Sequence, residues 1–145
     1  MKITIIDCPE GEVEEIIIKC RQMDEHLMRM IRTVKAGQER LIGTRNGQIM
    51  QIQPKEIYYF EAVDNRVFLY GEREVFETRY KLYELEERLG GTDFFRASKS
   101  VLLNLSKVKS FATALGGRFE ANMKNGEKLM ISRQYVPGLK EKLGL

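Results

Sequence analysis

The chain has 145 residues, of which 43% are hydrophobic and 31% are charged, and its net charge is +3. This length suits one domain with a short extension, and this apolar fraction is sufficient for a packed core. No apolar run approaches the roughly 20 residues of a membrane-spanning helix, and the acidic N-terminus does not match a signal peptide. We therefore expect a globular, cytoplasmic protein.

The residue types of metal and catalytic sites are scarce. Cys8, Cys20 and His26 are the only cysteines and the only histidine, too few for a Cys/His zinc site. In a reducing cytosol we expect both cysteines as free thiols, buried or half-buried. Glycine fingerprints for phosphates or dinucleotides are absent, and His26 has no neighbouring nucleophile. These absences predict a protein that is not an enzyme, with no catalytic residue, metal or cofactor.

Residues 1–40 are expected to form an N-terminal extension of two strands and a helix. Stretches 2–8 and 13–20 are rich in β-branched residues, and a helical pattern runs from Asp24, a candidate N-cap, to Gly37. Such a unit is too small for its own core, so it should pack on the rest of the chain or on a second copy. Core or dimer packing is also expected of the methionines at 23, 28 and 30.

Residues 41–145 are expected to form a second, mainly β unit of short strands joined by tight turns. Asn46-Gly47 and Asn125-Gly126 each separate two strand-like runs, which is a strong hairpin signal. The expected strands are 41–44, 49–52, 57–62, 66–70, 75–80, 95–104, 108–115, 118–123 and 128–132.

One helix interrupts these strands. Leu82, Leu85 and Leu89 recur at helical spacing, and Gly90-Gly91 follows as a stop signal. The tail from Arg133 is expected to begin as a loop or a short helical turn. The predicted fold class is therefore mainly β with one or two helices, as small antiparallel sheets plus a short β-β-α extension.

Positive charge is concentrated in the last third of the chain. Residues 1–95 hold 14 Lys and Arg against 18 Asp and Glu, a net charge of −4, whereas residues 96–145 hold 10 against 3, a net charge of +7. Such an asymmetry suggests a polyanionic partner, although an ordinary solvated surface would also account for it.

Three short segments combine a cation or amide with small or polar neighbours, so that the side chain can project. Lys and Arg neutralise phosphates, and Asn, Gln and Arg can read base edges through paired hydrogen bonds. The segments are Asn65-Arg66, Ser98-Lys99-Ser100 and Ser132-Arg133-Gln134-Tyr135. We interpret them as candidate nucleic-acid contacts.

From about Leu41 to Leu145 the chain resembles the LytTR family of bacterial DNA-binding domains. Four stretches carry the resemblance, in matching order and spacing: IYYFEAVDNRVFLY (57–70), KLYELEERL (81–89), FFRASKSVLLNLSKV (94–108) and KLMISRQYVPGLKEKL (128–143). The resemblance implies small antiparallel sheets whose loops and strand ends contact double-stranded DNA in successive major grooves.

The resemblance also implies which residues contact DNA. Asn65 and Arg66 fall on the family's first contact loop, Lys99 on its central contact, and Arg133 or Gln134 on its third. The expected interface is Asn65, Arg66, Ser98, Lys99, Ser100, Arg133, Gln134 and Tyr135. Ser98 departs from the family, which often has His at that position.

Two hypotheses follow. In the first, the protein is a standalone, response-regulator-like transcription regulator that binds promoter direct repeats as a homodimer. The N-terminal extension helps the two copies to pair. Short regulators of this kind resemble those that are restrained by a small membrane-bound protein. In the second, it is a protein-interaction module or anti-regulator of the same fold that has lost DNA reading, an alternative motivated by Ser98 and by the acidic first 95 residues.

Overall fold

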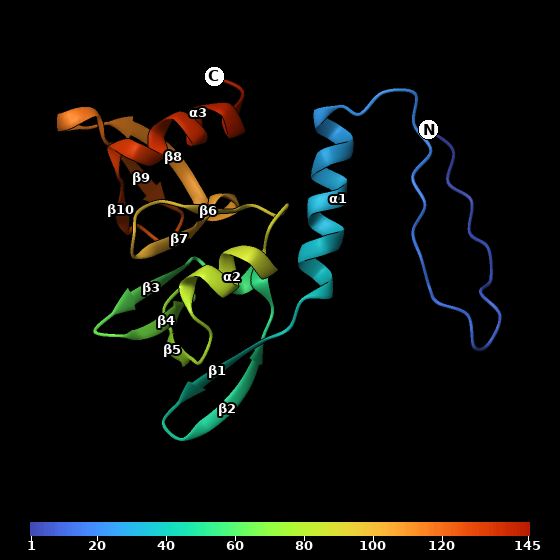
Figure 1. Cartoon of the computed structure of the whole chain (residues 1–145), viewed down its shortest axis with the longest axis horizontal. Coiled ribbons are helices and arrows are strands. Elements are labelled where there is room, and N and C mark those ends of the chain that lie inside the picture. The colour runs from blue at the N-terminus through green and yellow to red at the C-terminus, as the bar shows by residue number, and fades with distance from the viewer.

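The computed structural model describes residues 1–145 and contains two antiparallel sheets flanked by three helices (Figure 1). The larger sheet has seven strands in the order β2-β1-β5-β4-β3-β7-β6, and the smaller has three in the order β10-β9-β8. None of the helices combines the length and apolarity required to cross a bilayer.

The elements follow the chain in a simple order, with short 3-10 turns between several of them. The helices are α1 (Glu25–Gln38), α2 (Leu82–Arg88) and α3 (Val136–Leu143). The strands are β1 (Leu41–Arg45), β2 (Gln48–Ile52), β3 (Tyr59–Val63), β4 (Arg66–Tyr70), β5 (Val75–Thr78), β6 (Phe94–Arg96), β7 (Val101–Asn104), β8 (Val108–Thr113), β9 (Phe119–Met123) and β10 (Lys128–Ile131).

Local signals fix several of these elements. The β1–β2 turn has Asn46 at φ 51° and Gly47 at φ 76°, the left-handed conformations that a two-residue hairpin turn needs. Helix α1 begins where the sequence indicates, because the Asp24 carboxylate accepts a hydrogen bond from the Leu27 N–H at 2.9 Å. The predicted pairing of β9 with β10 is likewise confirmed.

Two apolar clusters lie on opposite faces of the larger sheet. Alternation along β3 and β7 sends Phe60 and Leu102 into the first cluster, together with the three leucines of the α2 region. The same alternation sends Tyr59 and Leu103 into the second cluster, between the larger sheet and the smaller sheet with α3. Leu82, Leu85 and Leu89 are buried, as their spacing predicts.

The single strand expected over residues 95–104 is wrong, because this stretch is a hairpin. Phe94 pairs with Asn104 and Arg96 with Leu102, and residues 97–100 form the connecting loop. The tail is also more regular than expected, since a 3-10 turn over Arg133–Tyr135 leads directly into α3.

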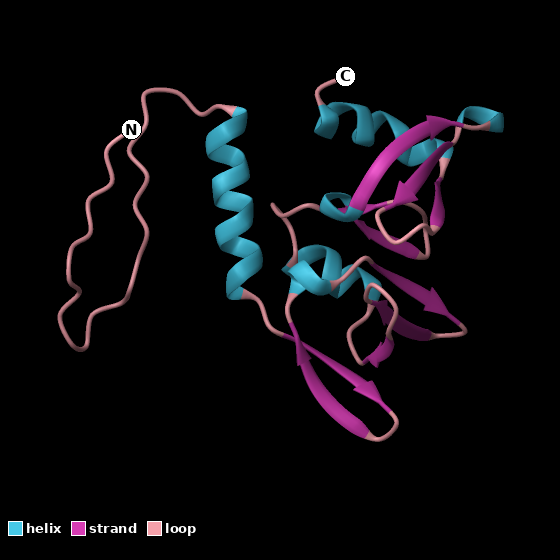
Figure 2. Ribbon diagram, turned by 180° about the vertical axis from the view of Figure 1, so that it is seen from behind, coloured by secondary structure: helices cyan, strands magenta, loops and turns pink.

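The two strands expected at 2–8 and 13–20 are absent. Residues 1–22 form an extended exposed excursion away from the sheets (Figure 2). A lone two-stranded ribbon is at best marginally stable in water, and here no third strand covers it. Cys8 and Cys20 are therefore exposed free thiols and not buried ones, and Met23 and Met30 remain 56% and 39% exposed.

Candidate nucleic-acid interface

The β6–β7 loop presents Lys99 on a braced backbone. Lys99 is exposed, while the Ser98 hydroxyl accepts a hydrogen bond from the Ser100 N–H at 3.2 Å. The Arg96 guanidinium donates to the carbonyl oxygens of Ser98 at 2.8 Å and Lys99 at 2.6 Å, and it pairs with Glu86 of α2 at 3.0 Å. Arg96 thus holds the loop that carries Lys99.

This bracing role was missed by sequence reasoning, because Arg96 is not among the candidate contact residues named from the sequence. Its carbonyl partners are two and three residues away, but its carboxylate partner Glu86 lies on a different element. A turn-closing arginine has no sequence pattern comparable to that of a hairpin or a helix cap, so only the tertiary arrangement reveals it.

The β3–β4 turn carries the predicted segment Asn65-Arg66. Asp64 and Asn65 adopt φ values of 50° and 65°, and short polar side chains tolerate this left-handed region best. Asn65 and Arg66 are both exposed. Arg66 is held by Glu77 of β5, with Nε–Oε1 at 2.9 Å and Nη2–Oε2 at 2.8 Å, and this pairing raises the pKa of the Arg66 guanidinium.

The third segment lies in the 3-10 turn after β10. Arg133 and Gln134 are exposed, whereas Tyr135 is partly buried against the second apolar cluster. Gly117 has φ +76°, and a Cβ placed on it would lie 3.0 Å from Cδ of Arg133. The absence of a side chain at Gly117 therefore leaves the space that Arg133 occupies.

Backbone hydrogen bonds bring the three segments together at one end of the larger sheet. The Ala62 N–H, next to the β3–β4 turn, donates to the Ser100 carbonyl at 2.8 Å. The Ser132 N–H donates to the Ala97 carbonyl, also at 2.8 Å. Segments that lie far apart in the chain are thereby linked as neighbours.

Two tyrosines between the two sheets, Tyr59 buried and Tyr70 partly buried, help to fix the relative position of the sheets. The rings of Tyr59 and Tyr70 stack with centroids 4.3 Å apart, and the Tyr59 hydroxyl donates to Glu127, beyond β9, at 2.8 Å. The pKa of Tyr59 is raised well above its ordinary value, mainly by burial and to a smaller extent by the Glu127 carboxylate. Burial also raises the pKa of Tyr70. Both hydroxyls therefore stay protonated at neutral pH and can donate.

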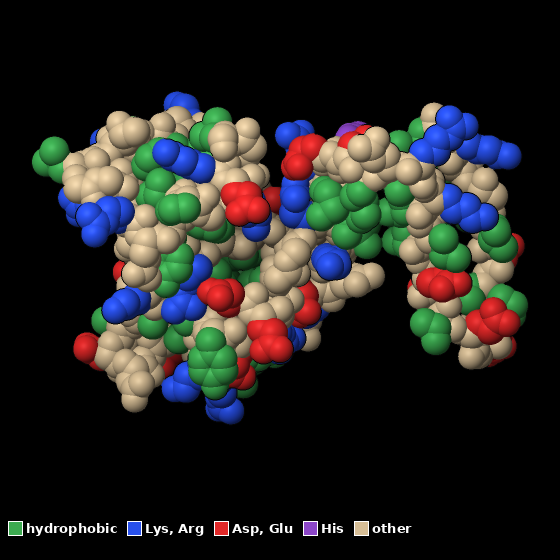
Figure 3. Space-filling model, turned by 45° about the horizontal axis from the view of Figure 1, so that its top comes forward, with side chains coloured by type: hydrophobic (Ala, Val, Ile, Leu, Met, Phe, Trp, Pro, Cys, Tyr) green, Lys and Arg blue, Asp and Glu red, His purple; other side chains and the backbone are tan.

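Charge on the surface follows the same division. Lys and Arg side chains are spread over the sheet-forming part of the molecule and also over the N-terminal segment and α1, where exposed apolar and acidic side chains lie among them (Figure 3). No cluster of three or more His, Cys, Asp or Glu side chains is suited to holding a metal ion. The exposed cations at the loop end of the sheet are suited to binding a polyanion.

Comparison with known proteins identifies the class. The family model described as "LytTr DNA-binding domain" matches residues 47–144, more than half of the chain. The chain therefore belongs to the LytTr DNA-binding domain family.

Individual relatives agree with this assignment. The chain is 28% identical over 98 residues to the sensory transduction protein LytT of Enterococcus faecalis and 24% identical over 147 residues to an HTH-type transcriptional regulator of Staphylococcus aureus. It spans 40% and 56% of the lengths of the LytT proteins of Enterococcus faecalis and Bacillus subtilis, but 99% of the Staphylococcus aureus protein.

The fold is shared with a solved structure. A LytTr DNA-binding domain from Bacillus cereus superposes with a TM-score of 0.71 and 23% identity, covering 75% of this chain and 100% of that one. The predicted mainly β fold is confirmed by this match and by the ten strands described above.

Proposed function

We propose that this protein is a sequence-specific regulator of transcription that reads the major grooves of double-stranded DNA with loops and strand ends. The observation that carries the proposal is the convergence of the three predicted segments at one sheet end, linked through the Ala62–Ser100 and Ala97–Ser132 hydrogen bonds. Membership of a DNA-binding domain family supports it.

Each segment has a role in this proposal. Lys99, on its braced loop, is the central contact, with Ser98 and Ser100 beside it as phosphate neighbours. Arg133 or Gln134 reads bases at the third contact, because both are exposed and both can form paired hydrogen bonds to a base edge. Tyr135 contributes only its exposed part, since its ring packs on the apolar cluster.

At the first contact loop, Asn65 is a better base reader than Arg66. Glu77 engages Nε and Nη2 of Arg66, which leaves Nη1 as the nitrogen not involved in that pair. Asn65 lies at the tip of the turn with a free side-chain amide, as it forms no side-chain hydrogen bond within the chain.

Assembly is part of the proposal. The exposed apolar residues of the N-terminal segment and α1 support a homodimer on DNA direct repeats, because they have no partner within one chain. Similarity to short regulators of this kind also motivates a small membrane-bound partner protein and a cytoplasmic location. The protein acts as a binding module and not as an enzyme.

The test is binding of promoter fragments by mobility shift, with a binding-site selection to supply the sequence. Lys99→Ala should weaken binding by about 1–3 kcal/mol, and either Arg133→Ala or Gln134→Ala should also relax base preference at one position. Lys55→Ala is the matched control, since this exposed lysine lies in the turn before β3, at the other end of that strand. A wild-type protein with no duplex preference that captures a protein partner would instead indicate an interaction module.

A further inference from the structure

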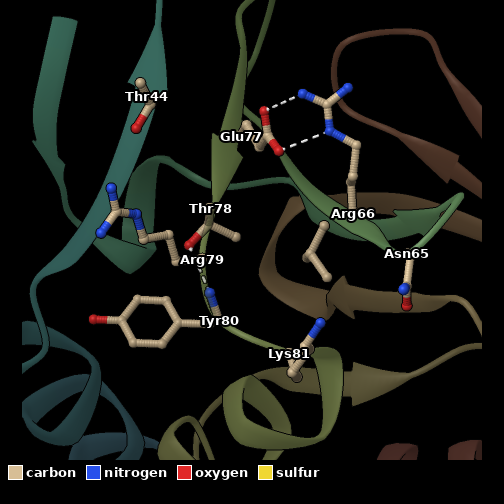
Figure 4. Close-up of a pocket in the computed structure, with 9 residues that line it drawn as sticks. Thr44, Asn65, Arg66, Glu77, Thr78, Arg79, Tyr80 and Lys81 are labelled. Carbon is tan, nitrogen blue, oxygen red and sulfur yellow. Dashed lines mark hydrogen bonds and ion pairs between the residues drawn. The ribbon is translucent and has the colours of Figure 1, made fainter.

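A pocket of about 390 Å³ opens beside the β3–β4 turn, at the end of the larger sheet where β5 leads toward α2. Figure 4 shows the pocket, and its walls come from β1, β4, β5 and the segment that leads into α2. It is lined by Thr44, Asn65, Arg66, Val67, Glu77, Thr78, Arg79, Tyr80 and Lys81.

The pocket carries uncompensated positive charge. Its only carboxylate, Glu77, is bound by both Nε and Nη2 of Arg66, as the two dashed lines in Figure 4 show. Arg79 and Lys81 are exposed and form no salt bridge in the chain. Three cations and one carboxylate give the lining a net charge of +2, and the two free cations supply it.

Strand pairing places these cations in line with the proposed DNA contacts. Thr78, the last residue of β5, pairs with Val67 near the start of β4, so Arg79 follows at the same sheet end as the β3–β4 turn. Three strand spacings separate β5 from β7, which begins just after Lys99. With about 4.8 Å between neighbouring strands, β5 and β7 lie about 14 Å apart, which is close to the roughly 12 Å width of a B-DNA major groove.

We propose that Arg79 and Lys81 clamp a phosphodiester of the DNA backbone at the border of the groove that the Lys99 loop enters. This inference rests on the proposed function and extends its footprint by one further strand. Thr44 lines the same pocket and can add a neutral hydroxyl donor to a phosphate oxygen.

The chemistry favours a phosphate over a base edge. Two unpaired cations with a hydroxyl donor suit an anionic oxygen, and the one carboxylate acceptor is already bound by Arg66. Phosphate contacts fix the register of a protein on DNA without reading its sequence. The pair Arg79 and Lys81 therefore contributes affinity and orientation, and leaves base preference to the other segments.

The experiment measures duplex affinity against salt concentration for the wild type and for Arg79→Ala/Lys81→Ala. Each phosphate contact contributes about 0.9 to the slope of log affinity against log salt, so the slope should fall by about one while base preference stays unchanged. Arg73→Ala/Lys55→Ala is the matched control: Arg73 lies just before β5 as Arg79 lies just after it, and both control residues are exposed. The control should keep the wild-type slope.

A second measurement uses only the wild-type protein. Ethylation of individual phosphates should reveal a position about one groove width from the bases read by Lys99 at which modification blocks binding. The inference is overturned if no such phosphate is found, or if the double variant and its control show the same slope. A wild type that binds no duplex, by contrast, overturns the proposed function itself.

A third measurement uses inorganic phosphate, because the same pocket could hold a small anion instead of a DNA phosphate. Addition of phosphate to the free protein is followed by the NMR signals of the Arg79 and Lys81 side chains. Saturable shifts together with an unchanged DNA salt slope in the double variant would assign the pocket to a free anion and overturn the DNA contact. A reduced slope with no saturable shift supports the backbone clamp.

Discussion

At the scale of single residues, the proposed interface depends on neighbouring residues that hold its candidate contacts in place. Gly117 provides the space for Arg133, and Glu77 fixes the guanidinium of Arg66. These dependences are steric and electrostatic, and each involves a partner from a different element. A substitution at such a residue should change recognition more than its own exposure suggests.

Gly117→Ala is expected to disturb Arg133. The new Cβ would lie 3.0 Å from Cδ and 3.1 Å from Cγ of Arg133, so this flexible side chain must move, and base preference at its position should relax. Alanine at φ +76° also costs about 1–2 kcal/mol of stability. Binding-site selection and chemical unfolding separate the two effects.

Gly47→Ala is the matched control for this substitution. Gly47 has the same φ of +76°, but no heavy atom lies within 4 Å of the position that a Cβ would take. It should therefore lose similar stability and keep the wild-type base preference. An unaltered preference in Gly117→Ala would show that Arg133 is not the reader, and would favour Gln134.

At the scale of elements, the β6–β7 hairpin is the unit that presents Lys99. Its strand β7 is anchored by pairing with β3, where Tyr59 pairs with Leu103 and Glu61 pairs with Val101. Its loop is closed by one guanidinium, which reaches two carbonyls and a carboxylate at once. The hairpin is thus rigid at its base and depends on Arg96 at its tip.

Arg96→Lys should weaken DNA binding about tenfold although it preserves the charge. A lysine ammonium is a point charge that cannot span the three acceptors, so the loop backbone should loosen. Amide hydrogen exchange should accelerate at Ser98 and Ser100, whose N–H groups donate to the Val101 carbonyl at 3.4 Å and to the Ser98 hydroxyl at 3.2 Å, and a loss of charge elsewhere would not cause this. Affinity and exchange would be measured on the same preparation.

Arg88→Lys controls for a general loss of an arginine contact. Arg88 pairs with Glu39 at 3.1 Å and lies 4.6 Å from the centroid of the Tyr80 ring, away from the β6–β7 loop. It should lose some stability and retain protected amides at Ser98 and Ser100. Equal exchange rates in both variants would contradict a bracing role for Arg96.

At the scale of the whole molecule, the N-terminal segment stands apart from the folded part. The first buried residue is Leu41, and α1 buries no residue, although Arg32 reaches Asp93 at 3.4 Å. Ile5 and Ile17 are 89% and 69% exposed, which is unusual for isoleucine in a soluble chain. The homodimer proposed above uses this exposed apolar surface.

Deletion of residues 1–22 should convert a dimer to a monomer and leave the fold intact. The free energy of unfolding of the remaining domain should change by less than about 0.5 kcal/mol, because no buried contact is removed. Light scattering coupled to size-exclusion chromatography gives the oligomeric state, and thermal melting gives the stability.

A charge-only variant, Glu14→Gln/Glu15→Gln, is the control for this deletion. It keeps the apolar residues of the segment and should remain dimeric. A truncated protein that is still dimeric would place the pairing surface elsewhere, for instance on the exposed side of α1.

Local patterns in the sequence determined most of the folded part. Asn46-Gly47 and Asn125-Gly126 specified their hairpins because tight turns need left-handed residues, and the leucine spacing of α2 specified its buried side. The Asp24 cap specified the start of α1. In each case the deciding interaction lies within a few residues, so a short window contains it. Residue types supplied the three candidate contact segments, and the resemblance of four stretches to one family assigned each of them to an expected DNA contact.

Only the tertiary structure decided the remainder. The β-branched stretches 2–8 and 13–20 have strand propensity, but a strand also needs a neighbour, and none is available within one chain. The split of residues 94–104 follows from the partners of β7, and the convergence of Arg79 and Lys81 with Asn65 follows from the order of strands in the sheet. Turns and helix caps depend on residues a few positions away, so the sequence by itself determined them. Pairing between distant segments depends on the whole chain, so only the tertiary structure decided it.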